Sequence, residues 1–147
     1  MGSRIGAFVA ALAATYIVGT LSYSQLNLAS LVELNMPVDA SVRLHTAWHD
    51  MTSMYGLYLP LVGVALLLAF LVTGLVLRWL PQLRVLGYIL GGAAAIWVMD
   101  YLLGAFLTGG THPLVVTRTP AGLLSQCLAG AVGGYVFVTL LSRAKAG

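Results

Sequence analysis

This 147-residue chain has few charged side chains and only one cysteine, and both shortages limit what it can be. Asp, Glu, Lys and Arg together make up 7% of the residues, whereas hydrophobic residues make up 60% and the mean hydropathy is +0.96. A soluble domain of this size would lack enough polar surface to cover itself, so the composition predicts a lipid environment. With Cys127 alone, the chain has neither a disulfide framework nor a CxxC redox motif.

The motifs of common enzyme and nucleic-acid-binding classes are also missing. The sequence has no glycine-rich phosphate loop, no serine spaced with a histidine and an acid, and no second acid beside Asp100 for a membrane aspartyl dyad. The net charge of +3 and the pI near 9.3 come without a basic stripe or basic and aromatic residues in alternation. We therefore expect no catalytic activity and no nucleic-acid partner.

Four long apolar segments are present instead. A helix needs about 20 apolar residues to cross about 30 Å of hydrocarbon. The segments cover residues 5–23, 57–77, 85–107 and 121–141. They predict an all-α integral membrane protein, a single domain built as a four-transmembrane-helix bundle in contact with the lipid bilayer.

The basic residues indicate how this bundle is oriented, because positive charge near span ends is retained in the cytoplasm. One side of a four-span topology carries Arg4, Arg78, Arg84, Arg143 and Lys145. The other side carries two arginines and three acids, which are Arg43, Arg118, Glu33, Asp39 and Asp50. We expect a bacterial inner membrane with both termini cytoplasmic. Aromatic residues near span ends, including Tyr58 and Tyr88, fit interfacial belts.

Residues 24–56 form the one long stretch outside the predicted spans, and they are too apolar for a free loop. Pro37 and Asp39 favour a helix start, with Asp39 at the N-cap. The stretch therefore predicts an interfacial helix on the outer face, between the first and second spans.

Helical periodicity places polar groups on one face of this interfacial helix. Val42, His45, His49 and Thr52 recur at intervals of three and four residues, so they share a face. We expect His45 and His49 to turn toward the bundle and Asp50 toward water or a basic group.

The same histidines raise a metal hypothesis. His45 and His49 have the i, i+4 spacing of a metal-binding pair, Asp50 adjoins them, and topology places His112 on the same outer face. A divalent metal or haem site is one interpretation. The other is a set of interfacial histidines that only form hydrogen bonds or titrate.

Asp100 is the acid that falls within a predicted span. A carboxylate there costs roughly 2.5 to 3.5 kcal/mol on insertion scales, so it should face the bundle interior. Its candidate partners, besides the three histidines, are Arg118, Ser125 and Gln126. Proton relay, ion coordination and a static structural pair all fit this position.

Small residues four positions apart mark the third and fourth spans. Gly87 and Gly91 precede the middle of one, and Gly130 and Gly134 lie within the other. Such spacing lets helix backbones approach closely, within one chain or between chains.

These observations favour two alternative functional hypotheses. The first is a non-catalytic subunit or accessory protein that packs through these glycines in a homo-oligomer or a larger membrane complex. The second is a protein that binds a metal or haem, or conducts protons or ions, through an outer-half site of His45, His49, His112 and Asp100.

Overall fold

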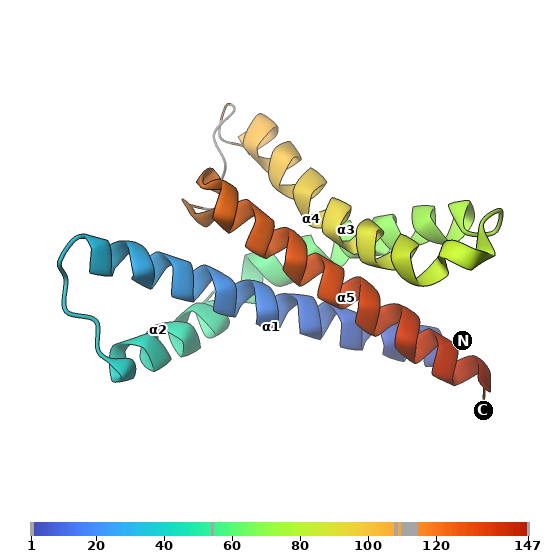
Figure 1. The fold of residues 1–147 in the computed structure, drawn as a ribbon, viewed down its shortest axis with the longest axis horizontal. Helices are drawn as coiled ribbons and strands as arrows, with labels where there is room; N and C mark the ends of the chain where they lie inside the picture. Colours follow the sequence, from blue (N-terminus) through green and yellow to red (C-terminus); the bar gives the residue numbers. More distant parts are fainter. Residues whose placement is uncertain (1, 54, 108, 110–114, 147) are drawn as a thin grey trace.

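The computed structural model describes residues 2–53, 55–107, 109 and 115–146 (Figure 1). The elements, in chain order, are α1 (Gly2–Glu33), α2 (Ala40–Ser53), α3 (Tyr55–Val76), the 3-10 helix η1 (Pro81–Leu83), α4 (Arg84–Leu107), the 3-10 helix η2 (Val115–Arg118) and α5 (Pro120–Ala146). Every element in these residues is a helix, which confirms the all-α prediction. Four helices, α1, α3, α4 and α5, are long and apolar enough to cross a membrane.

Helix α1 continues well past the predicted span end at Tyr23. Hydropathy falls after Tyr23, but residues 24–33 contain neither glycine nor proline and the helix continues to Glu33. It ends before Asn35, which has a φ of 57°, and Pro37. The end of the apolar run at Tyr23 is therefore not the end of the helix, which stops only before Pro37 and the positive φ of Asn35.

Helix α2 folds back along the end of α1, and residues 24–53 form what we call the α1–α2 hairpin (Figure 1). Asp39 directly precedes α2, and its carbonyl accepts the Arg43 backbone N–H at 3.0 Å, as expected of an N-cap residue. The Arg43 guanidinium donates to Gln25 Oε1 of α1 at 3.2 Å. Leu28 and Ala47, one on each arm, are buried.

Helix α5 runs between α1 and α4 and packs closely on both, while α3 packs mainly on α4 (Figure 1). Gly130 requires the absence of a side chain, because a Cβ there would lie 2.2 Å from the carbonyl oxygen of Gly92. A Cβ on Gly134 would lie 1.9 Å from the Tyr88 carbonyl oxygen. These positions define the α4–α5 seam.

The other two predicted glycines face α3 and the residue that follows it. Gly91 lies against the Thr73 side chain, and Gly87 lies against Leu77. All four glycines therefore serve contacts within this chain.

The bundle has two ends of different character. Helices α1 and α5 bring Gly2 and Ala146 to one end, which we call the terminal end (Figure 1). Tyr88 is buried there among Phe70 and Phe137, with ring centroids at 5.7 and 5.1 Å, so its assignment to an interfacial belt was wrong. The end of α4 and the start of α5 form the opposite, loop end.

Candidate functional site

Asp100 lies inside the bundle on α4, toward the loop end, with 1% of its surface exposed. The buried Thr117 of η2 donates its hydroxyl hydrogen to Asp100 Oδ1 at 2.8 Å. The carboxylate also lies within electrostatic range of the Tyr58 hydroxyl and the Cys127 thiol. The expected interior position of Asp100 is therefore observed, and one of its hydrogen bonds comes from a threonine that the sequence pattern did not suggest.

Gln126 of α5 joins three helices in the same half of the bundle. Its Oε1 accepts the Tyr58 hydroxyl of α3 at 2.8 Å, and its Nε2 donates to the Gly19 carbonyl of α1 at 2.9 Å. The side chains of Tyr58 and Gln126 are both buried. A Cβ on Gly19 would stand 2.9 Å from the Tyr58 hydroxyl oxygen, so glycine is needed for this approach. The amide thus fixes the spacing of α1, α3 and α5.

Three residues that contact Asp100 or Gln126 were not predicted from the sequence. Tyr58 was assigned to an outer aromatic belt, but its ring is buried and its hydroxyl bonds to Gln126. Gly19 and Thr117 carried no signal that separated them from other small residues in apolar sequence. A tyrosine near a span end fits a belt or a buried hydrogen bond equally well, so only the tertiary structure separates the two.

Ser125, Arg118 and His112 were also predicted near Asp100. Ser125 is half-buried and donates to the Gly122 carbonyl of its own helix at 2.7 Å. Arg118 follows Thr117 and its side chain is exposed. His112 lies outside the described residues.

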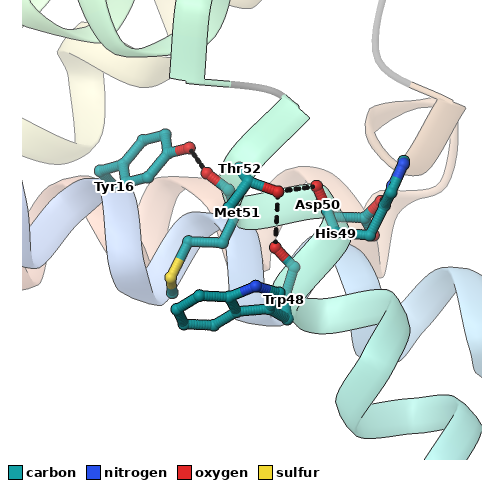
Figure 2. A network of polar contacts seen from close by, with 6 residues as sticks. All are labelled: Tyr16, Trp48, His49, Asp50, Met51 and Thr52. Atoms are coloured by element: carbon teal, nitrogen blue, oxygen red, sulfur yellow. Dashed lines mark hydrogen bonds and ion pairs between the residues drawn. The ribbon is translucent and has the colours of Figure 1, made fainter.

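A second set of contacts holds α2 against α1. The Tyr16 hydroxyl of α1 donates to the carbonyl of Met51, in the last turn of α2 (Figure 2). The Tyr16 ring also lies 6.0 Å from that of Tyr58, which connects the hairpin to the buried network.

The orientation predicted for the histidines was wrong. His45 is exposed, and the His49 side chain is 69% exposed, whereas that of Asp50 is only 18% exposed. In Figure 2 the His49 ring points away from Tyr16. Ala47 is the buried residue of α2, because its small side chain lets the helix approach α1 closely. With Ala47 facing α1, the face of α2 that carries His45 and His49 points outward.

His45, His49 and Asp50 are also not tightly connected to one another. His49 Nδ1 lies 3.9 Å from Asp50 Oδ1, and Asp50 Oδ2 has no hydrogen-bond partner within the described ranges. In the part of the chain that the structure describes, no three His, Cys, Asp or Glu side chains lie close enough to hold one metal ion. His45, His49 and Asp50 therefore do not make a metal site on their own.

The buried groups at the loop end can hold helices together, and the Asp100 carboxylate can also bind a proton or a cation. Ser24 adds a fully buried hydroxyl on α1 that has no hydrogen-bond partner among the described residues. Such a group is costly in an apolar interior and would be satisfied by water or a ligand. Comparisons with protein-family models, curated proteins and solved structures found no match to this chain.

Proposed function

We propose that this chain is a non-catalytic accessory subunit of a larger membrane complex, and that the α1–α2 hairpin is the surface that docks its partner. In this proposal the four long apolar helices cross a bacterial inner membrane with both termini in the cytoplasm. The basic residues support that orientation, because Arg4, Arg78, Arg84 and Arg143 all belong to the terminal end.

The length of α1 supports a hairpin outside the hydrocarbon. Its 32 residues give a helix about 48 Å long at about 1.5 Å per residue. Even at a tilt of about 40° it would extend about 37 Å along the membrane normal, more than the roughly 30 Å of hydrocarbon. With Arg4 held at the other boundary, the turn between α1 and α2 lies beyond the apolar core.

The observation that carries the docking proposal is the exposure of large apolar side chains on this projecting hairpin. Leu34 at the turn is 71% exposed and Leu44 on α2 is 75% exposed, with Met36 and Trp48 also exposed. Exposed apolar groups outside the lipid are typical of surfaces that bind another protein. The four predicted packing glycines already contact residues of their own chain, so their spacing does not by itself indicate a seam for a partner.

Site-specific photo-cross-linking in native membranes tests the proposal. A photoreactive amino acid at Leu34 or Leu44 should give a protein adduct of defined mass. The same residue at Leu128, exposed on α5 within a membrane-length stretch, should label only lipid. Lipid adducts alone from all three positions would show that α2 lies in the membrane interface without a partner. An adduct of two identical chains would replace the larger complex with a homo-oligomer.

The topology has its own test. Reporter fusions at Gly147 and near Asn35 should fall on opposite sides of the membrane. Finding both on one side would overturn the proposed orientation, and with it the location of the hairpin.

The burial of Asp100 favours a second candidate function, proton or ion transfer. A carboxylate in a membrane-length helix is a functional candidate by default, and Thr117 and Tyr58 lie close to it. In proteoliposomes with an imposed membrane potential, Asp100→Asn should abolish proton or cation flux that the wild type supports. A wild type without flux would leave Asp100 as a structural residue, with the accessory function unaffected.

A further inference from the structure

A cleft of about 840 Å³ opens at the terminal end of the bundle. The start of α1, the second half of α3, the start of α4 and the end of α5 form its walls. Phe8, Phe70, Tyr88 and Phe137 line its apolar part. Glycine at position 74 leaves part of the α3 wall without a side chain. The volume falls within the roughly 300 to 1,000 Å³ typical of small-molecule sites.

Three arginines line the same cleft. Arg4 comes from the first turn of α1, Arg78 follows α3 and Arg84 begins α4. They come from three separate places in the sequence, and the fold brings them to one apolar opening. Charge near a span end is enough to orient a membrane protein, but orientation does not require the charges to share a cleft.

No acidic side chain of the chain belongs to this end. Glu33, Asp39 and Asp50 belong to the α1–α2 hairpin and its turn. Asp100 lies sixteen residues farther along α4 than Arg84, a rise of about 24 Å. The positive charge of the cleft is therefore not neutralised by any Asp or Glu of the protein, and an anion from outside would complement it.

We propose that this cleft binds one anionic phospholipid from the surrounding leaflet. The arginines contact the lipid phosphate, since guanidinium groups donate paired hydrogen bonds to phosphate oxygens. The apolar part, next to Phe70 and Phe137, receives the upper part of one acyl chain. Basic pockets between membrane helices on the cytoplasmic side suit such head groups because that leaflet supplies anionic lipids. This site is independent of the hairpin and of any partner bound there.

Native mass spectrometry of the full-length protein in mild detergent tests the proposal. Phosphatidylglycerol is added, and phosphatidylcholine with the same acyl chains serves as the uncharged comparison. We expect one phosphatidylglycerol per chain, bound in preference to phosphatidylcholine. The double variant Arg4→Gln and Arg84→Gln should weaken phosphatidylglycerol binding about 25-fold, since each arginine near an anionic surface contributes about fivefold.

A matched control distinguishes binding in the cleft from attraction of lipid by the positive charge of the whole terminal end. Arg143→Gln removes a positive charge from the same end, but Arg143 does not line the cleft, so binding should not change. A second variant, Leu71→Trp, places a large side chain at the apolar wall and should weaken binding with all arginines retained. It keeps the proposal testable if the double arginine variant fails to fold, which circular dichroism would reveal.

Three results would overturn the proposal. One is equal binding of the charged and uncharged lipids. Another is an equal loss of binding in Arg143→Gln, which would mean that the charge of the whole end attracts lipid without a specific site. The third is displacement of phosphatidylglycerol by millimolar inorganic phosphate, which would identify a site for soluble phosphate and not for lipid.

Discussion

The two ends of the bundle are held together by different chemistry. At the loop end, buried polar side chains join helices by directed hydrogen bonds, as Gln126 does for Tyr58 and Gly19. At the terminal end, aromatic rings pack the helices together, and the Phe70 and Phe137 ring centroids are 4.5 Å apart. A hydrogen bond fixes a single spacing between two atoms, whereas rings tolerate several arrangements. The cleft proposed to bind lipid lies beside these rings.

The α4–α5 seam is what the two ends share, and breaking it should have the largest effect. In Gly130→Leu the first added carbon would meet the Gly92 carbonyl, so the helices must separate along their length. We expect a loss of more than about 3 kcal/mol in the free energy of unfolding, measured by denaturant titration of helicity in detergent. Gly6→Leu is the control, because a Cβ at Gly6 meets nothing within 4 Å. Wild-type stability in Gly130→Leu would mean that the seam is not this close.

Removing a ring from the terminal end should have the next largest effect. Phe70 is buried and contacts Phe8, Tyr88 and Phe137, so Phe70→Ala removes three ring contacts at once. We expect the free energy of unfolding to fall by about 3 kcal/mol. The variant should recover part of this loss when phosphatidylglycerol is added, if the enlarged cleft takes up lipid. Val72→Ala, at an exposed position on the same helix, should change stability little.

Removing the amide at the loop end should cost less. Gln126→Leu keeps the size of the side chain but leaves the Tyr58 hydroxyl and the Gly19 carbonyl without their partner. Interhelical hydrogen bonds in membranes average about 0.6 kcal/mol, so a loss of about 1 to 2 kcal/mol is expected for two. Ser125→Ala should be neutral, since the hydrogen bond that the structure describes for that hydroxyl lies within its own helix. A loss greater than that of Phe70→Ala would reverse the ranking of the two ends.

The sequence predicted the helices well because hydropathy and segment length are local properties. Composition and four apolar segments of sufficient length anticipated α1, α3, α4 and α5. The extension of α1 to Glu33 was missed because the apolar run ends at Tyr23, ten residues before the helix does. The burial of Asp100 was predicted correctly, since an uncompensated carboxylate has no stable place against lipid.

What the sequence did not predict depends on packing between segments. The face of α2 that turns inward is decided by how closely Ala47 approaches α1, and periodicity alone offered several faces. Thr117 lies on η2, which packs against α5 and α1, and its contact with Asp100 of α4 is one that no local pattern signals. Tyr58 and Tyr88 lie near span ends in the sequence, yet both are buried.

The smallest effect is expected from the histidines of α2. Since His45 and His49 are exposed, their double replacement by alanine should change the free energy of unfolding by no more than about 0.5 kcal/mol. Ala47→Leu on the buried face of the same helix should cost about 1 to 3 kcal/mol, because the added carbons press α2 away from α1. Elemental analysis of the same preparations completes the test. A stoichiometric metal in the wild type that disappears in the double variant would show that the outward face binds a ligand, and would move the functional centre from the polar interior to the hairpin surface.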